Sequence, residues 1–473
     1  MKIIQVELNY RLSDESLSQP QSDPMTGSIP FPFRVVDSQG ALLAEGAVDS
    51  RTPSEVFIKD SSDSEQLFVR LMWPTGNHAT KVARFEGGNR ARVVFSDQLV
   101  SVDPWSSWAA SRIPKTQTFA RASRSSNNAD ESLHKFQNVW LRLWQRSASG
   151  WSYEEQLPRH SVKRSESIAQ LDLDLSEGGH LLQLGGQLMP FVFVSLPGNG
   201  TCRVLLTPNA STGGNKNLPL KVVVSSFRPK AEMLVEFLSR DSMQAAKAIK
   251  EHDADAWTLL QEKYKDPVSA IAGAYYLLRS GEWRSTPIQW FENLYASFPW
   301  SSDAALIRCV VDMRLGLRTP DDARRALRCL SESIERGIPL FEEAHRINIE
   351  AYTLLGALLK PGTDASSDSG FLDLQPRERR KYQEVLNNCQ RLAVARAWTG
   401  AAFSYFGAEP DKPTAERLTG KAPTMEAALG DNRIALVRRA SGFSASNMAT
   451  RKGTSSLTSG RRPKSAVTYL KDL

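Results

Sequence analysis

The side chains that could perform chemistry in this 473-residue chain do not combine into a recognised catalytic or metal-binding pattern. The four cysteines are far apart and form no Cys-x-x-Cys pair, and the six histidines form no His-Glu-x-x-His motif, so the ligand spacing of a zinc site is missing. The strained Gly-x-Ser-x-Gly turn of a serine hydrolase is also missing. We therefore expect no catalytic residue, no metal ion and no cofactor.

Two cysteines and two aspartates come closest to forming a site. A cysteine nucleophile needs a histidine beside it in space, but Cys309 and Cys329 fall within amphipathic helical patterns, and we expect both to be small, buried and reduced. Asp172 and Asp174 alternate with leucines on one face of a strand and could form a calcium or catalytic pair. Because no third acid accompanies them, we expect a solvated strand face instead.

Two glycine-rich segments could cradle a phosphate group through backbone N–H groups. These are Gly198-Asn199-Gly200-Thr201 and Gly213-Gly214-Asn215-Lys216. Neither completes a known phosphate-binding loop motif, and both lie between predicted strands. They are therefore interpreted as hairpin turns.

Short apolar stretches separated by Gly, Pro and Asn turns predict strands in the first half of the chain. They indicate an antiparallel β-sandwich-like module over residues 1–114 and a second β-rich module over 134–227, joined by a Ser- and Arg-rich linker at 115–133. Trp105 and Trp108 follow the last strand of the first module. We expect them to close the end of the sandwich rather than to bind a ligand.

Residues 228–402 predict a helical, repeat-like domain. Three helix starts are indicated by a capping side chain before a proline, at Asp266-Pro267, Thr286-Pro287 and Thr319-Pro320. The helices predicted at 303–316 and 320–336 form a pair of about 34 residues, the length of a tetratricopeptide-type (TPR-like) unit, although the fuller signature is absent. The apolar stripe of the second helix consists of Ala323, Ala326, Leu327, Leu330 and Ile334.

Aromatic residues are dense in the helical domain, and we expect most of them to fill the core between stacked helices. The cluster comprises Tyr275, Tyr276, Trp283, Trp290, Phe291, Tyr295, Phe298 and Trp300. Trp283 and Trp300 lie near predicted helix ends. They are our candidates for a groove that binds a protein partner.

The net charge of +7 arises almost entirely from the carboxy-terminal segment. From Arg433 onwards there are nine Lys or Arg and one Asp, which gives this segment +8 and leaves −1 for the rest of the chain. Apolar residues become sparse beyond Ala440, and residues 403–473 are predicted to be a poorly ordered basic tail. Any nucleic-acid binding is then expected to be weak and to come from this tail.

Composition indicates a cytoplasmic protein that does not bind membranes. Hydrophobic residues make up 41% and charged residues 23% of the chain, as in ordinary globular proteins. Gln5 and Glu7 interrupt the first apolar residues, so no signal peptide is expected. No apolar run approaches the roughly 20 residues that span a bilayer.

Two groups of segments resemble uncharacterised bacterial multidomain proteins in which a β-module precedes a TPR-like helical domain. The first group is residues 69–76, Gly87-Gly88 and the strand to Phe95, and the second is residues 266–279, Phe298-Pro299-Trp300 and Arg336-Gly337-Ile338-Pro339. The resemblance covers about half of the chain. It implies a bacterial, cytosolic protein with an accessory role beside a protease or a defence effector.

These observations favour a non-enzymatic adaptor or regulatory protein that binds a protein partner through its helical domain. Two alternatives stay open. One is a nucleic-acid-associated protein that uses the basic tail together with the linker. The other is an unrecognised hydrolase, or a protein that a partner protease cleaves. The sequence does not indicate the oligomeric state.

Overall fold

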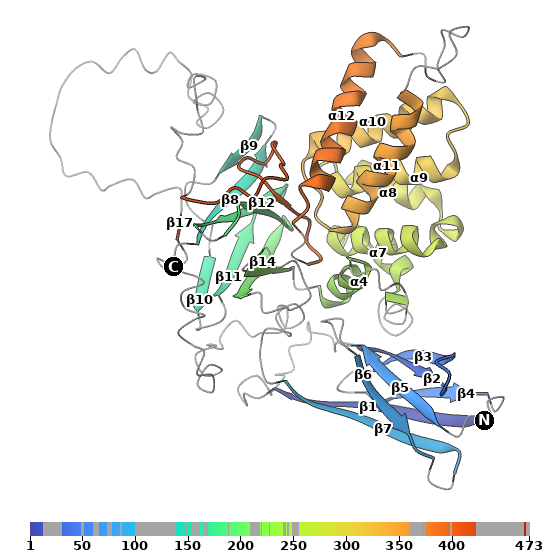
Figure 1. Cartoon of the computed structure of the whole chain (residues 1–473). Helices are drawn as coiled ribbons and strands as arrows, with labels where there is room; N and C mark the ends of the chain where they lie inside the picture. Colours follow the sequence, from blue (N-terminus) through green and yellow to red (C-terminus); the bar gives the residue numbers. More distant parts are fainter. Residues whose placement is uncertain are drawn as a thin grey trace, which may run out of the picture.

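The computed structural model describes most of the chain in three parts, two β-rich modules and a helical block (Figure 1). The described residues are 1–12, 31–48, 52–59, 66–72, 78–85, 88–99, 139–147, 149–153, 160–164, 169–187, 189–208, 218, 220–226, 228–239, 243, 246–247, 255–359, 372, 374–397, 400–421 and 468–469. The predicted linker, Trp105, Trp108, the segment 213–216 and, within the predicted basic tail, residues 422–467 and 470–473 lie outside these residues. Within the described residues, no helix has both the length and the apolar character that a bilayer-spanning segment needs.

The first β-rich module contains two sheets that share a core. Its strands are β1 (Lys2–Leu12), β2 (Phe31–Val36), β3 (Leu42–Val48), β4 (Ser54–Ile58), β5 (Leu67–Met72), β6 (His78–Ala83) and β7 (Arg90–Leu99). One sheet has the order β4-β1-β7 and the other β3-β2-β5-β6. All neighbouring strands are antiparallel except β1 and β7, which are parallel. The alternation in β7 buries Val93 and Phe95 and leaves Arg92 exposed, as an amphipathic strand requires.

The second β-rich module also contains two sheets, and one of them is buried on both faces. Its strands are β8 (Trp140–Ser147), β9 (Gly150–Tyr153), β10 (His160–Arg164), β11 (Ala169–Leu175), β12 (His180–Gly185), β13 (Val192–Leu196), β14 (Gly200–Pro208) and β15 (Leu220–Ser225). One sheet has the order β10-β11-β14-β15, and in the other β12 lies between β8 and β13. On β12, Leu182 packs toward the opposite sheet, whereas Leu181 belongs to the core shared with the helices. The result is a stack of two sheets and a helical layer (Figure 1).

Two predictions for this module are wrong. Asp172 does not lie on a solvated face, because its carboxylate is buried and forms an ion pair with Arg203, directly opposite on β14, at 2.6 Å. Asp174 is exposed as predicted. The turn at Gly198-Asn199-Gly200 is not a hairpin, because β13 and β14 belong to different sheets. Gly198 is required there, since an added Cβ would lie 2.2 Å from the carbonyl oxygen of Gly178.

The helical block follows β15 and packs beside the second module (Figure 1). Its helices are α4 (Pro229–Ser239), α6 (Ala256–Gln261), α7 (Pro267–Ser280), the 3₁₀ helix η3 (Glu282–Ser285), α8 (Ile288–Ser297), α9 (Ser302–Leu315), α10 (Pro320–Arg336), α11 (Glu343–Leu359) and α12 (Pro376–Val394). The α9–α10 pair matches the predicted helix pair. On α10 the predicted stripe is confirmed, because Leu327 and Leu330 are completely buried. The predicted fold class, β-rich modules followed by a helical domain, is thus confirmed.

Two of the three predicted helix caps are confirmed. The Asp266 carboxylate accepts a hydrogen bond from the Ser269 N–H, and Thr319 forms a capping box with Asp322. The prediction for Thr286 is wrong. Its hydroxyl donates to the carbonyl of Glu282 and so completes η3, which leaves α8 without a side-chain cap.

The prediction that order is lost from residue 403 onward is wrong for residues 403–421. After α12 the chain returns to the second module, where β16 (Ser404–Phe406) pairs with β13 at the edge of the doubly buried sheet (Figure 1). Phe403 and Tyr405 are completely buried, and this apolar area offsets the entropy of ordering the segment. A two-residue strand, β17 (Thr468–Tyr469), pairs with the opposite edge, on β8. Residues on both sides of the helical block therefore build the same sheet.

The helical block meets this returning segment at a buried polar junction. The Glu342 N–H donates to the carbonyl of Ala401 at 2.8 Å, and the Phe403 N–H donates to that of Leu340 at 2.8 Å. The Glu342 carboxylate contacts Arg396 and lies 3.6 Å from Nε2 of His345, whose ring stacks on Phe403. Burial outweighs the attraction of Arg396 and raises the pKa of Glu342 to about 8, while burial lowers the pKa of His345 to about 3.

Candidate functional site

Five partly or fully exposed aromatic residues gather at the α6–α8 end of the helical block, and we call this set the aromatic surface. Its members are Trp257 on α6, Tyr264 before α7, Trp290 on α8, and Phe298 and Trp300 in the turn between α8 and α9. Tyr264 is 68% exposed, an unusual degree for a large aromatic side chain. The other four are each partly buried, and Trp257, Trp290 and Phe298 pack against the hydrophobic core.

The rings of the aromatic surface contact one another in two groups. Trp257 and Trp290 lie edge to face with ring centroids 5.7 Å apart. Phe298 lies 6.1 Å from Tyr264 and 6.0 Å from Trp300, so it joins those two rings. A hydrogen bond of 3.1 Å between the hydroxyls of Tyr264 and Ser297 fixes the exposed ring. These contacts hold the aromatic side chains in place before any partner binds.

Lys263 connects the two groups. Its ammonium lies 5.6 Å from the ring centroid of Tyr264 and 5.8 Å from that of Trp290, within the range of cation–π attraction. The same ammonium donates a hydrogen bond to the carbonyl of Leu260 at 3.3 Å. Burial lowers the pKa of Lys263. Because this lysine faces the rings from within the protein, a partner meets an aromatic surface rather than a cationic one.

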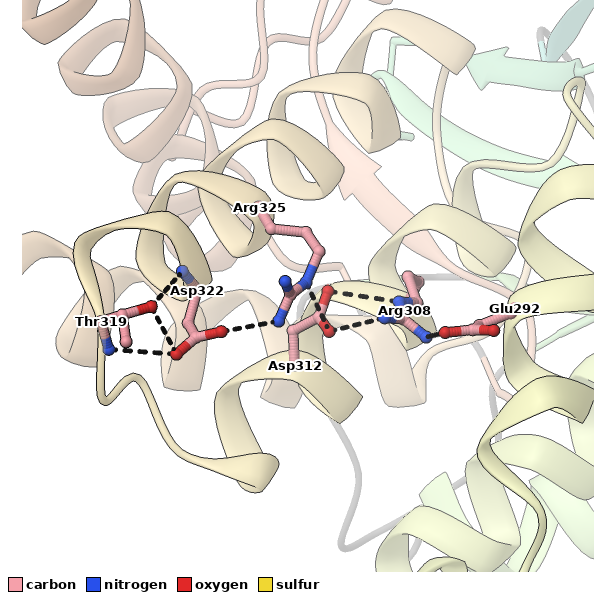
Figure 2. A network of polar contacts seen from close by, with 6 residues as sticks. All are labelled: Glu292, Arg308, Asp312, Thr319, Asp322 and Arg325. Carbon is pink, nitrogen blue, oxygen red and sulfur yellow. Dashed lines mark hydrogen bonds and ion pairs between the residues drawn. The ribbon is translucent and has the colours of Figure 1, made fainter.

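A polar network positions α8, which carries Trp290, against α9 and α10 (Figure 2). The buried carboxylate of Asp312 accepts hydrogen bonds from Arg308 at 2.8 and 3.2 Å and from Arg325 at 3.2 Å. Arg308 also contacts Glu292 on α8 at 2.9 Å. Positive and negative charges alternate along this chain of contacts, and Arg325 continues it to Asp322 in the α10 capping box. We interpret the network as a framework that fixes helix positions.

Arg336 holds the turn that carries Phe298 and Trp300. Its Nη1 donates to the carbonyls of Tyr295, Phe298 and Ser301 at 3.2, 3.3 and 3.4 Å. Its guanidinium lies 4.5 Å from the ring centroid of Tyr295. Ser301 then caps α9 by accepting from the Ala304 N–H. The turn is therefore fixed by α10 on one side and by α9 on the other.

The structure separates the two predicted partner-binding residues. Trp300 lies in the aromatic surface and is partly exposed. Trp283 on η3 is only 7% exposed and packs in the hydrophobic core, so it can offer a partner little area. Sequence reasoning missed Trp257 and Tyr264. Trp257 lies in the first turn of α6 and Tyr264 in the turn that follows it, and the apolar pattern indicated neither element.

The cysteines, which are the candidate nucleophiles of the chain, are buried. All four cysteines are buried, as predicted for Cys309 and Cys329. Burial raises the pKa of the Cys329 and Cys389 thiols to about 12 and that of Cys309 well above its ordinary value, which disfavours a thiolate nucleophile at neutral pH. Across the described ranges, His, Cys, Asp and Glu side chains form no group of three that could hold a metal ion.

A small cavity lies where β15, α4 and residues 400–402 meet. Its volume of about 40 Å³ has room for roughly two or three water molecules. Glu232 lines it, but this buried carboxylate already accepts hydrogen bonds from Ser225, Ser226 and Arg228. Burial raises the pKa of Glu232 in spite of these donors. The cavity is too small for a substrate of ordinary size.

The helical part of the chain matches a known family. Residues 233–457 match the family model described as Y4kD C-terminal domain. The matched range starts within α4 and includes the rest of the helical block and β16. The chain is therefore a β-rich amino-terminal region followed by a region that is similar to the Y4kD C-terminal domain. No curated protein and no solved structure matches the chain.

Proposed function

We propose that the protein is a non-enzymatic adaptor whose helical block binds a protein partner through the aromatic surface. The observation that supports this proposal is the gathering of Trp257, Tyr264, Trp290, Phe298 and Trp300 at one end of the block. Trp and Tyr are enriched among residues that dominate protein–protein binding energy. They bury much area at small entropic cost when their rings are already fixed.

The rigid support of the aromatic surface strengthens the proposal. Arg336 fixes the Phe298–Trp300 turn, and the network around Asp312 fixes α8. Ile288, which begins α8, is 39% exposed and adds an aliphatic group on the helix that carries Trp290. A partner that presents aliphatic or aromatic side chains would fit this surface, since Tyr264 is exposed, the other four rings are partly exposed and Lys263 is buried.

The wider role rests on sequence resemblance. A bacterial, cytoplasmic adaptor that accompanies a protease or a defence effector agrees with the resemblance described above. The α9–α10 pair, which has the length of a TPR-like unit, agrees with a binding role for the helical block.

The experiment uses the full chain, because residues on both sides of the helical block build one sheet and neither part is complete alone. Full-length protein is the bait in a pull-down with crosslinking and mass spectrometry from the source cells, followed by calorimetric titration of the partner. Trp300→Ala and Tyr264→Ala should each weaken binding by about 1–3 kcal/mol. Tyr382→Ala, which removes a partly buried aromatic on α12, is the matched control and should change affinity little. Equal losses in all three variants, or crosslinks confined to the β-rich modules, would contradict the proposal.

A weaker second candidate is nucleic-acid binding, and α12 supplies an observation in its favour. The helix contains five Lys or Arg and two Glu, and Arg377, Arg380 and Arg391 are exposed. Exposed arginines along one helix can contact phosphates. A gel shift with duplex DNA and with RNA should then weaken steeply with salt and be lost in the double variant Arg377→Gln/Arg380→Gln. A shift that depends only on residues 441–473 would instead assign the binding to the basic tail.

A further inference from the structure

The outer face of the sheet β3-β2-β5-β6 carries one apolar side chain from each of its four strands, and we call this set the outer row. The registers of the three strand pairs bring its members side by side, in the order Leu42, Val36, Phe68 and Val82. Among the described residues, the hydrophobic core cluster of the module contains Val35 and Val69, the sequence neighbours of two members, and none of the four. Because successive residues of a strand point to opposite faces, the outer row lies on the face away from the core.

The outer row forms a continuous apolar strip that water reaches. Leu42 and Val82, at its two ends, are 47% and 41% exposed, and Phe68 between them is partly exposed. The solvent-facing side of an antiparallel sheet usually presents polar side chains. Single exposed apolar residues are common, whereas contiguous ones mark an interaction site. Three strand spacings of about 4.8 Å give the strip a length of roughly 14 Å.

A row of polar residues runs beside the outer row and carries positive charge without a counter-charge. Its members, in the same strand order, are Glu45, Arg34, Arg70 and Thr80. Arg34 and Arg70 lie directly opposite each other, an arrangement of like charges that destabilises a sheet. The carboxylate of Glu45 lies 3.8 Å from the ammonium of Lys247 instead. In the part of the chain that the structure describes, neither guanidinium forms an ion pair, so a partner can supply the missing negative charge.

The helical block reaches this face at one side and leaves the other side open. Lys247, which contacts Glu45, follows α4 in the chain, and Glu45 belongs to the edge strand β3. Toward the opposite edge, Arg70, Thr80 and Val82 are all exposed. A partner can therefore approach the two rows from the side of β5 and β6.

An acidic amphipathic helix complements both rows. A helix rises 1.5 Å per residue, so about ten residues, nearly three turns, cover the outer row. Apolar residues at i, i+3, i+4 and i+7 then lie on the outer row. Glutamates along one border reach the arginines, because Phe68 and Arg70 are about 7 Å apart along β5. Nucleic acid also supplies negative charge, but the aliphatic members of the outer row offer its bases no stacking platform.

We propose that the outer row, with Arg34 and Arg70 beside it, is the docking surface for an acidic amphipathic helix of a protein partner. The apolar stripe of the helix buries the outer row. Its carboxylates pair with the two guanidiniums and so offset the repulsion between them. The surface belongs to the first β-rich module, is separate from the aromatic surface and does not depend on it.

Fluorescence anisotropy with two designed peptides tests the proposal on the full chain. Both are labelled 18-residue helices with leucines at i, i+3, i+4 and i+7, and their borders carry glutamates in one peptide and lysines in the other. The native chain should bind the glutamate peptide at least about tenfold more tightly than the lysine peptide, because its carboxylates face the arginines. The double variant Arg34→Glu/Arg70→Glu should reverse this preference. Arg90→Glu, at an exposed position on β7 in the other sheet, is the matched control and should leave the preference unchanged.

Further variants keep the test decisive. Arg70→Glu alone serves if the double variant unfolds, because it places opposite charges side by side on β2 and β5, and it should weaken the glutamate peptide by about fivefold. Val82→Asp should weaken the same peptide by about tenfold or more, since it puts a carboxylate beneath the apolar stripe. Val394→Asp changes a 62% exposed valine on α12 and should have no effect.

Hydrogen–deuterium exchange locates the peptide on the native chain. The glutamate peptide should slow exchange at residues 34–36, 68–70 and 80–82. Binding of neither peptide, equal binding of both to the native chain, or protection confined to other residues would each overturn the proposal. Duplex DNA that displaces the glutamate peptide would assign the face to nucleic acid instead. A native dimer that Val82→Asp dissociates would assign it to a second copy of this chain, and either result contradicts the proposal.

Discussion

The substitution Asp312→Asn tests whether the polar network fixes the helical block. The carboxylate of Asp312 is fully buried and receives three hydrogen bonds from the guanidiniums of Arg308 and Arg325. An asparagine has the same shape, but it has one acceptor oxygen and no charge, and its amide N–H groups would face a guanidinium. Among the described residues, the change therefore leaves Glu292 as the acidic partner of Arg308, whose side chain is 10% exposed.

The expected loss follows from these contacts. Breaking a buried ion pair by removing one partner costs about 3–5 kcal/mol. Two features reduce that cost here, because Glu292 still contacts Arg308 and because the Arg325 side chain is 41% exposed and can be hydrated. We therefore expect Asp312→Asn to lower the free energy of unfolding of the helical block by roughly 2–4 kcal/mol.

The assay is urea unfolding followed by far-ultraviolet circular dichroism, read at the transition that carries the helical signal. Asp321→Asn is the matched control, because the Asp321–Arg324 pair lies on α10, the helix that also carries Arg325, and the Asp321 side chain is 87% exposed. An exposed pair contributes about 0–1 kcal/mol, so the control should shift the midpoint little. Equal shifts in both variants would refute the idea that the network holds the helices together.

Four further outcomes are expected. Leu327→Asp should abolish the helical transition, because a carboxylate at this fully buried position costs several kcal/mol, and an unchanged melting curve would contradict the packing of α10. Gly185→Ala should cost about 1–3 kcal/mol by overpacking against Trp140, measured by urea unfolding, whereas Gly88→Ala, with open space around it, should be nearly neutral. In the folded chain the pKa of Glu342 is about 8, whereas its ordinary value is 4.5. Between these two pH values the folded chain keeps the carboxyl proton that the unfolded chain has lost. The lowered pKa of His345 opposes this effect below its ordinary value of 6.5, because there the unfolded chain binds a proton that the folded chain does not. Stability should therefore fall as the pH rises from about 6.5 to about 8, and urea midpoints across this range should show a smaller fall in Glu342→Gln. Deleting residues 441–473 should lower stability by no more than about 1–2 kcal/mol, since the described part of this segment contributes only the two residues of β17, and a larger fall in the urea midpoint would show that the tail packs elsewhere.

Local patterns predicted the helical block well. The caps at Asp266 and Thr319 and the apolar stripe through Leu327 and Leu330 depend on residues within a few positions of one another, which a sequence displays directly. The prediction that Thr286 caps α8 failed because its hydroxyl donates to the carbonyl of Glu282 in η3 instead. A competing turn just before a helix is difficult to recognise from residue types alone.

Long-range pairing explains the predictions that failed. Arg203, which forms the ion pair with Asp172, lies 31 residues away on a strand that was not predicted. Without this partner in view, the sequence predicted that the Asp172 carboxylate is solvated. β16 has only three residues, and its partner β13 lies some two hundred positions earlier. Of the five members of the aromatic surface, the sequence singled out Trp300 as a candidate, because it lies near a helix end. Whether Trp283 or Tyr264 faced the solvent depended on how the helices pack.

The return of β16 to β13 has a consequence for synthesis on the ribosome. The strand that completes the edge of the central sheet begins at Ser404, which is made 179 residues after Ser225, the last residue of β15. At bacterial or eukaryotic elongation rates this corresponds to a delay of about 10–35 s. During that time the edge at Val192–Val194 has no partner strand, in a sheet already rich in apolar side chains. The helical block must also fold so that its two ends lie close together before β16 can pair with β13. Nascent chains of this protein are therefore expected to depend on chaperones most strongly between the synthesis of β15 and that of β16.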